Sequence, residues 1–219
     1  MNRKFTLDVI CVSFSLQEGV NYINKLISIH GTKDIYYCLV FKREDIPLRS
    51  IKNAEHFKII KQKNIGIYDA MNLGYASCFS TWAIFSNVGD TLVKLPDNLD
   101  SNYAINCFPV DVYSFDKKYL FVRQPNMGGR LMPPHQGMFF NRNLLPEMPY
   151  NTKFLYAGDF ELFARFKHQS IFYHSPVVSE FYLGGVSNQT STLFRRKLER
   201  FSIILRNIKN IFFVRNLSG

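Results

Sequence analysis

Cysteine is scarce in this sequence, and long apolar runs are absent. The 219 residues contain four cysteines, with no C-x-x-C pair and no histidine at zinc spacing: Cys11, Cys38, Cys78 and Cys107. Each lies in an apolar run, which predicts buried free thiols in a reducing compartment. No stretch approaches the ~20 apolar residues that span a bilayer. These absences argue against a disulfide-stapled secreted domain, a zinc module and a membrane-spanning protein.

A recognisable secretory signal is also missing. The N-terminus, Met1–Lys4, is basic, but Asp8 interrupts the apolar run that follows, and no small-residue cleavage site comes after it. We therefore expect the protein to stay in the cytoplasm. With 47% hydrophobic and 20% charged residues, the chain has the composition of a folded protein with a buried core.

Negative charge is scarce near the C-terminus. The net charge of the chain is +10, and residues 191–219 hold seven lysines and arginines against one acid, Glu199. Apolar residues recur there every three or four positions, which predicts an amphipathic helix over Leu193–Leu217. Two interpretations are open: the helix lies among the headgroups of an anionic membrane, or it packs on the domain with its basic face in water. The apolar positions are Phe194, Leu198, Phe201, Leu205, Ile208 and Phe212.

Strand and helix patterns alternate in the first half of the chain. This order is typical of a mostly parallel sheet with helices on its faces, an α/β fold of the Rossmann-like kind. The expected strands are Leu7–Phe14, Ile35–Phe41, Phe57–Ile60 and Trp82–Ser86, and the expected helices are Glu18–His30 and Ile67–Phe79.

The second half is less regular. Strand-like runs at Tyr103–Phe115, Gly137–Phe140 and Ile171–Leu183 are separated by proline-rich turns, and one helix is expected at Asp159–His168. The pattern indicates a nucleotide-binding α/β half joined to an irregular α+β half in one unit.

An acidic residue follows the strand at Trp82–Ser86. In Asn87–Asp90, Asp90 should lie in a loop at the carboxyl end of that strand, where open α/β sheets bind ligands. A carboxylate there can hold Mg²⁺ or Mn²⁺ together with diphosphate oxygens. Gly-Asp is also common in turns, so a purely structural turn is the alternative.

The segment Gly66–Gly74 places polar groups at the start of a helix. Gly66 can provide a tight turn into the helix, and Gly74 can allow close approach of the helix to a strand. Asp69 and Asn72 are three residues apart and share one face of the first turn. An acid also suits a helix N-terminus, so helix stabilisation is the alternative to ligand binding.

These two segments together resemble a known family. GIYDAMNLGYA followed by WAIFSNVGD is similar to the D-A-M-N and N-x-G-D pattern of family 2 glycosyltransferases of the GT-A fold, which include enzymes that build bacterial surface polysaccharides. Four further segments occur in the family's order and extend the resemblance over about Leu7–Ser187: LDVICVSF, PHQGMFF at 134–140, AGDFEL at 157–162 and LGGVS at 183–187.

The resemblance implies a fold and an activity. It implies a single GT-A domain over residues 1–190, with a nucleotide-sugar-binding half over 1–92, an acceptor half over 93–190 and the basic helix over 191–219. The activity would be transfer of a sugar, with inversion, from a nucleotide donor to a saccharide acceptor. For this chain we expect the acceptor to be lipid-linked and the enzyme to lie at the inner face of the cell membrane.

The resemblance also implies roles for individual residues. Asp90 matches the acid that bridges Mn²⁺ or Mg²⁺ to the donor diphosphate, and Asp159 matches the catalytic base; for Asp159 a helix N-cap is the alternative. His135 and Gln136 match a pair near the reacting sugar, where His135 could contact metal, phosphate or acceptor. The residues expected on the donor side are Ser13, Gly66, Asp69, Asn72 and Asp90.

The sequence also departs from the family. Val40–Asp45 has no D-x-G-S stretch, and Lys63-Asn64-Ile65 replaces an acid that often precedes G-I-Y-D. UDP is the default donor nucleotide by prevalence in the family. The departures leave a catalytically inactive GT-A domain within a transferase complex as one alternative. A basic nucleic-acid-binding module is a further alternative, but most aromatic residues fall in core positions, so we expect no nucleic-acid partner.

Overall fold

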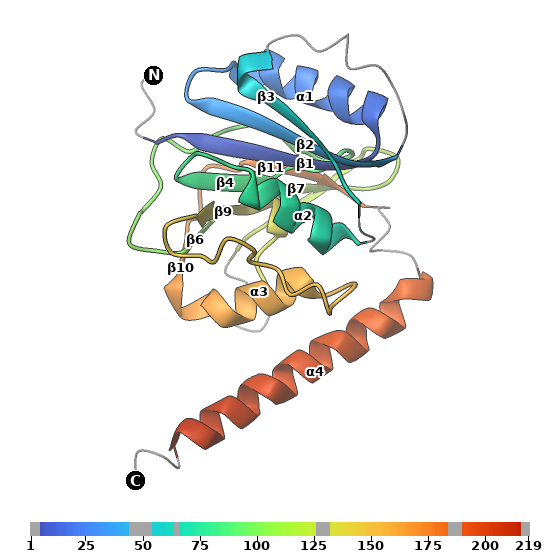
Figure 1. Ribbon diagram of the computed structural model, residues 1–219. Coiled ribbons are helices and arrows are strands. Elements are labelled where there is room, and N and C mark those ends of the chain that lie inside the picture. The colour runs from blue at the N-terminus through green and yellow to red at the C-terminus, as the bar shows by residue number, and fades with distance from the viewer. Residues whose placement is uncertain (1–4, 44–53, 64–65, 126–131, 184–189, 216–219) are drawn as a thin grey trace.

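A seven-stranded sheet forms the centre of the computed structural model, which describes residues 5–43, 54–63, 66–125, 132–183 and 190–215 (Figure 1). The strand order is β10-β6-β9-β4-β1-β2-β3. All neighbours are parallel except β9, which runs antiparallel to β4 and β6. The predicted mostly parallel α/β sheet is therefore confirmed. Its strands are β1 Leu7–Ser15, β2 Ile35–Arg43, β3 Phe57–Lys61, β4 Trp82–Phe85, β6 Ile105–Cys107, β9 Met138–Asn141 and β10 Ser170–Phe172.

Helices α1 (Leu16–His30) and α2 (Ile67–Ala76) cover opposite faces of this sheet. Side chains alternate along β1, so Val9 packs in the cluster with α1 while Ile10 packs in the cluster with α2. Both faces are buried, which explains why the strands are continuous apolar runs in the sequence.

Gly74 lets α2 lie close to the sheet, as predicted. A Cβ atom at this position would come within 2.5 Å of Cγ2 of Ile10. The helix ends at Ala76, three residues before the expected end at Phe79. The reason lies in β1: the Asp8 carboxylate accepts hydrogen bonds from the backbone N–H groups of Phe79 and Ser80, so these groups are drawn out of the helix.

A second, four-stranded sheet has the order β5-β11-β7-β8 and packs its apolar side into the core on the α1 side. Two predicted strands are each split between the two sheets. Pro109 separates β6 from β7, and Pro176 lies between β10 and β11, because proline has no N–H for a strand ladder. Strands β5 and β8 are not evident from the sequence. The strands are β5 Thr91–Leu92, β7 Val110–Tyr113, β8 Tyr119–Arg123 and β11 Ser179–Tyr182.

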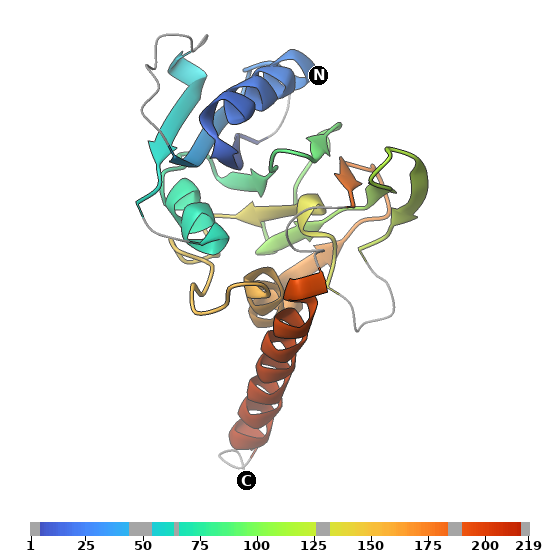
Figure 2. The same ribbon diagram turned by 90° about the vertical axis from the view of Figure 1, so that its right-hand side faces the viewer.

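Two further helices lie on the side of the molecule away from α1. Helix α3 (Gly158–Phe166) lies beside α4 (Thr190–Arg215), which then extends away from the body of the protein (Figures 1 and 2). The last turn predicted for α3 is a separate 3-10 helix, η4. The short 3-10 helices are η2 Ala54–His56, η3 His135–Gly137 and η4 Lys167–Gln169.

All four cysteines are buried and free, as predicted. No helix within the described ranges combines the length and apolarity required to cross a bilayer. The closing Gly-Gly-Val-Ser at 184–187 lies outside the described residues. The side chains of the last residues of the apolar stripe, including Ile208 and Phe212, are also not among those that the structure describes.

Candidate active site

Asp90 lies just beyond the carboxyl end of β4, in a tight turn. Its backbone N–H donates to the carbonyl oxygen of Asn87 (3.1 Å), and Gly89 has a φ of 104°, which favours glycine. The Asn87 side chain accepts from the backbone N–H of Val12 (3.3 Å), which ties the turn to β1. Asn87–Asp90 is therefore a turn, and the turn presents the carboxylate at the edge of the sheet that binds ligands in such folds.

The Asp90 carboxylate is poorly solvated. Gln136 Nε2 donates to its Oδ2 (3.2 Å), and the backbone N–H of Tyr182 also donates to the carboxylate. Burial nevertheless raises the pKa of Asp90 to about 7. A carboxyl group whose pKa is raised by burial ionises more easily when a cation lies beside it, because the positive charge favours the ionised carboxylate.

Asp90 fits a divalent ion that is shared with a substrate. Within the described ranges no group of three or more His, Cys, Asp or Glu side chains could hold a metal by itself. Mg²⁺ commonly uses one or two carboxylates together with substrate phosphates instead of an all-protein cage. A single, poorly solvated carboxylate therefore suits a metal that arrives with a diphosphate, and Asp90 is the residue that would hold it.

Asp159 lies in the first turn of α3 and is not its N-cap. The cap is Ala157, with no side-chain capping bond, so the N-cap interpretation is wrong. The Asp159 Oδ1 accepts from the Tyr68 hydroxyl (3.1 Å) and from the backbone N–H of Phe160 (2.8 Å). Oδ2 has no hydrogen-bond partner in the described part of the chain. One oxygen is held in place while the other is available to an incoming proton.

Three aromatic side chains continue from Asp159 into the site. The Tyr68 ring stacks on Tyr150, with centroids 5.3 Å apart and planes at 24°. The Tyr150 hydroxyl lies 2.6 Å from His135 Nε2. Burial lowers the pKa of His135, against the opposing charge of Asp159, so the imidazole is neutral near pH 7. Gly158 permits this packing, because a Cβ there would lie 2.8 Å from the Tyr68 ring.

These contacts join the two predicted carboxylates. The Asp90 carboxylate accepts a hydrogen bond from Gln136, and His135, the neighbour of Gln136 in the chain, contacts Tyr150. The Tyr150 ring stacks on the ring of Tyr68, whose hydroxyl donates to Asp159. Four predicted site residues therefore lie along one continuous set of contacts: Asp90, Gln136, His135 and Asp159. Tyr68 and Tyr150 were not predicted; Tyr68 lies within the GIYDAMN motif, which was the available signal.

The structure places the remaining donor-side residues nearby but gives several of them structural partners. Ser13 is buried at the end of β1, and its hydroxyl donates to the Ser15 carbonyl (2.7 Å). Asn72 is buried, with both ends of its amide bonded to the backbone of Tyr150 (2.8 and 2.9 Å). Gly66 is the N-cap of α2 at a φ of 135°, which confirms the tight turn. Donor contacts from these residues stay predictions.

Asp69 also lies in the first turn of α2, as its spacing from Asn72 predicts. Gln62 Nε2 lies 3.5 Å from its Oδ2 and 2.8 Å from the Gly66 carbonyl oxygen. A donor contact from Asp69 is likewise still a prediction.

Helix α4 is fixed to the domain by one face. The Glu199 carboxylate accepts from three consecutive backbone N–H groups, those of residues 155–157, at 2.8–2.9 Å. One turn further on, Ile203 is buried against Phe154 and Ala157. The predicted packing of the helix on the domain is thus confirmed for this face, and it holds the segment that leads directly into Asp159.

The opposite face of α4 is exposed. Among the described side chains of the predicted stripe, Phe194 is 70% exposed, Leu198 52% and Phe201 59%. Leu205 is also exposed, at 43%. These positions are separated from Glu199 and Ile203 by about half a helical turn, since each residue advances roughly 100°. Packing on the domain therefore does not cover the stripe.

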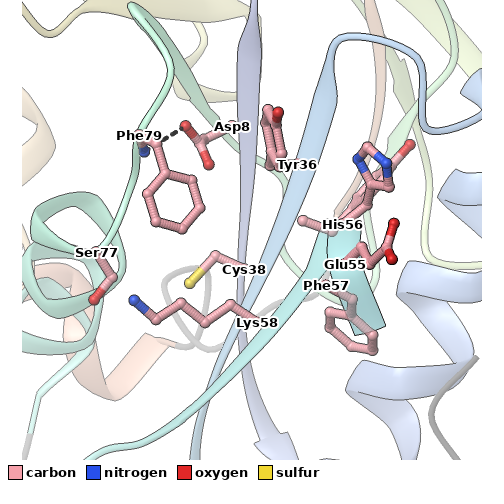
Figure 3. Close-up of a pocket in the computed structure, with 10 residues that line it drawn as sticks. Asp8, Tyr36, Cys38, Glu55, His56, Phe57, Lys58, Ser77 and Phe79 are labelled. Carbon is pink, nitrogen blue, oxygen red and sulfur yellow. Dashed lines mark hydrogen bonds between the residues drawn. The ribbon is translucent and has the colours of Figure 1, made fainter. Parts of the chain in front are cut away.

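A pocket at the other edge of the sheet has a structural explanation. It is lined by residues at the amino ends of β1, β2 and β3, including Asp8 and Tyr36, with Phe79 beside them (Figure 3). The Asp8 carboxylate is 2% exposed and binds the Phe79 and Ser80 N–H groups at 3.0 and 2.6 Å. This pocket lies away from the edge that carries Asp90, and its buried acid serves to join β1 to the end of α2.

Comparison with known proteins identifies the fold. The sequence matches no family model and no curated protein. The structure is similar to Staphylococcus aureus TarS in complex with UDP, with a TM-score of 0.58 and 9% identity over 82% of this chain. It is similar to the mannosyltransferase PcManGT from Pyrobaculum calidifontis in complex with GDP-Man and Mn²⁺, with a TM-score of 0.63 and 11% identity over 94% of this chain.

A third similar structure is glucosyl-3-phosphoglycerate synthase from Mycobacterium tuberculosis in complex with Mn²⁺, UDP-glucose and phosphoglyceric acid. The TM-score is 0.55, with 11% identity over 93% of this chain and 80% of the other. The present chain spans 61% of the TarS structure and 65% of PcManGT. At these identities the likeness establishes the fold, and the predicted GT-A fold is confirmed.

Proposed function

We propose that this protein is a glycosyltransferase that moves a sugar from a nucleotide donor to a saccharide acceptor with inversion at the anomeric carbon. The observation that carries the proposal is the continuous set of contacts between Asp90 and Asp159 on a GT-A scaffold. Structures of the same fold, TarS and PcManGT, hold UDP and GDP-Man respectively, which supports a nucleotide-sugar donor; UDP remains our choice for this chain.

The mechanism assigns one carboxylate to each substrate. Asp159 would accept a proton at Oδ2 from the acceptor hydroxyl as that oxygen attacks the anomeric carbon, while Tyr68 and Phe160 hold Oδ1. A single displacement inverts the configuration and needs no covalent sugar–enzyme intermediate. Asp90 and Gln136 would lie at the donor diphosphate. A divalent ion bound by Asp90 would supply Lewis-acid stabilisation of the negative charge on the leaving nucleotide.

The proposal is tested by a screen of nucleotide sugars with and without Mn²⁺. A ligand that binds only the folded state raises its apparent stability, by about 2.7 kcal/mol when present at 100 times Kd. We expect a UDP-sugar to raise the melting temperature in the presence of Mn²⁺, and slow donor hydrolysis to accompany binding. If a nucleotide sugar binds but is never turned over, the inactive-partner alternative is correct. If no nucleotide sugar binds, the proposal fails.

We further propose that the acceptor is lipid-linked and that α4 lies on the membrane surface. The exposed apolar stripe runs through Phe194, Leu198 and Phe201, and exposed basic residues flank it on both sides, Arg195 on one and Lys197 on the other. A helix with an apolar face and basic flanks suits the headgroup region of anionic lipids. A surface-polysaccharide acceptor held on a lipid would then meet the enzyme at that surface.

Vesicle binding tests this arrangement. The full chain should co-sediment with vesicles that contain phosphatidylglycerol and much less with pure phosphatidylcholine. The double variant Leu198→Asp and Phe201→Asp should bind at least about tenfold more weakly, since burying one such side chain contributes roughly 1.5–3 kcal/mol. Phe115→Asp, at a residue that is 85% exposed on the β7–β8 turn, is the matched control and should bind normally. Equal binding by both variants would refute a membrane role for the stripe.

A further inference from the structure

Three tyrosines form a row across the second sheet. Tyr182 of β11, Tyr113 of β7 and Tyr119 of β8 are register partners on adjacent strands, and we call them the tyrosine row. Tyr182 and Tyr113 stack, with centroids 5.1 Å apart and planes at 23°, and Tyr113 meets Tyr119 edge to face at 5.7 Å and 75°. In β7 the alternate residues Val110 and Val112 belong to the core. The row therefore lies on the face of the sheet that points away from the core.

The tyrosine row starts at the candidate active site. Asp90 directly precedes β5, which pairs with β11. In β11 the Ser179 hydroxyl donates to the carbonyl oxygen of Gln136 (2.8 Å), whose side chain donates to Asp90 (3.2 Å). The backbone N–H of Tyr182 also donates to the Asp90 carboxylate. From there the row crosses to β8, the last strand of this sheet, so a molecule bound along the row would be continuous with the site.

Tyr119 offers a ring surface to a ligand. Its side chain is half exposed. An edge-to-face contact covers at most one face of a ring, so Tyr113 leaves at least one face of the Tyr119 ring uncovered. At the other end of the row, the Tyr182 hydroxyl donates to Glu180 (2.8 Å), which fixes that ring. A flat ring held by its neighbours suits the apolar C–H face of a sugar, because both surfaces leave water on contact.

The acidic residues beside the row define the charge of the ligand. Asp111 and Glu180 are register partners, and each lies two residues before a tyrosine of the row, on the same face. The pKa of Asp111 is raised, first by partial burial and then by the charge of Glu180. Among the described residues the Asp111 carboxylate has no hydrogen-bond donor and no lysine or arginine partner. It can accept strong hydrogen bonds from sugar hydroxyls but repels phosphate, although the whole chain carries a net charge of +10.

We propose that the tyrosine row is a binding platform for a neutral saccharide. One sugar ring would stack on Tyr119 and donate hydroxyl groups to Asp111. That the saccharide is part of the acceptor rests on the proposed function, in which the strands of the row belong to the acceptor half. The binding of a neutral saccharide does not depend on that function.

A glycan array tests the platform with the full chain and without any turnover. The array carries neutral hexose and N-acetylhexosamine oligosaccharides beside sialylated and phosphorylated ones, and we expect the neutral ones to bind. Tyr119→Ala should bind them about five- to tenfold more weakly, the scale of one lost aromatic contact. Tyr119→Phe keeps the ring and should bind as wild type does. Phe115→Ala, at an exposed ring on the β7–β8 turn outside the row, is the matched control and should also bind normally.

Further measurements separate the possible outcomes. An unchanged melting temperature should show that Tyr119→Ala is folded. The variant should bind UDP with Mn²⁺, and anionic vesicles, as wild type does; weaker binding of UDP would assign the ring to the donor, weaker binding of vesicles would assign it to a membrane, and either result would overturn the platform. Failure of every neutral oligosaccharide to bind, or equal binding by wild type and Tyr119→Ala, would also overturn it. Saccharide binding that depends on Tyr119 in a chain that binds no nucleotide sugar would support the platform and refute the proposed function.

Discussion

Replacing Asp159 by asparagine is expected to reduce sugar transfer by about 10²- to 10⁴-fold, the range for loss of a general base. Asparagine has nearly the same shape and can still accept the Tyr68 and Phe160 hydrogen bonds at its carbonyl oxygen, but it cannot take a proton from the acceptor hydroxyl. The affinity for the donor should change little, because the contacts assigned to the donor lie at Asp90. Turnover number and donor Kd, measured separately, check this expectation.

Two further variants help to interpret this experiment. One removes an acidic residue elsewhere on the surface, and the other removes a hydrogen-bond partner of Asp159. Asp116→Asn removes an acid from an exposed pair with Lys118 (2.9 Å) and should leave turnover unchanged. Tyr68→Phe keeps the stacked ring but removes the bond to Asp159, so turnover should fall while the base remains. An Asp159→Asn enzyme with wild-type turnover would show that another group takes the proton.

Replacing Asp90 by asparagine is expected to have opposite effects on stability and on metal-dependent binding. In the folded chain the pKa of Asp90 is raised from 3.8 to about 7. The folded state therefore binds the proton more tightly than the unfolded state, and this stabilisation is complete below about pH 4 and lost as pH rises to about 7. Without metal, Asp90→Asn should thus become more stable than wild type across this interval, by on the order of 2–4 kcal/mol at pH 8.

Adding a divalent metal together with the donor should favour wild type over Asp90→Asn, the reverse of the order of stability without metal. Mn²⁺ with a UDP-sugar should raise the melting temperature of wild type at pH 8, where the carboxylate is ionised, and should do so weakly in Asp90→Asn. The effect on wild type should decrease as pH falls below about 7, because the proton and the metal compete for one carboxylate. Thermal melts over pH 4–8 with and without Mn²⁺ provide both comparisons. Equal metal responses in the two proteins would exclude Asp90 as a ligand.

Much of the central sheet could be predicted because its signals are local. Both faces of β1 and β2 are buried, so these strands are unbroken apolar runs, and helix periodicity marks α1 and α2 between them. Gly74 could also be assigned correctly, because a glycine within a helix suggests close packing. In the candidate site, Asp90 was placed by its position after a buried strand, a rule that depends only on strand order.

What could not be predicted depends on contacts distant in sequence. Tyr68 and Tyr150 are 82 positions apart in the printed chain, and nothing in either segment indicates that their rings stack. The N-cap alternative for Asp159 was wrong because helix α3 begins one residue earlier than expected, after Ala157, and the segment before it is held by Glu199 from another helix. Strand β8 was missed because its apolar side chains, such as Tyr119 and Phe121, are half exposed.

The two faces of α4 have a geometric consequence for the acceptor. One face holds α3 and the segment before Asp159, and the other would touch lipid, so only the thickness of a single helix separates the two. That thickness is about 10–12 Å with side chains. The reactive hydroxyl would therefore meet the base at a fixed, small height above the headgroups, and a glycan that already carried several sugars would have to bend back toward the bilayer to reach it. If α4 lies on a membrane as proposed, this arrangement would favour the first additions to a short chain over the elongation of a long one.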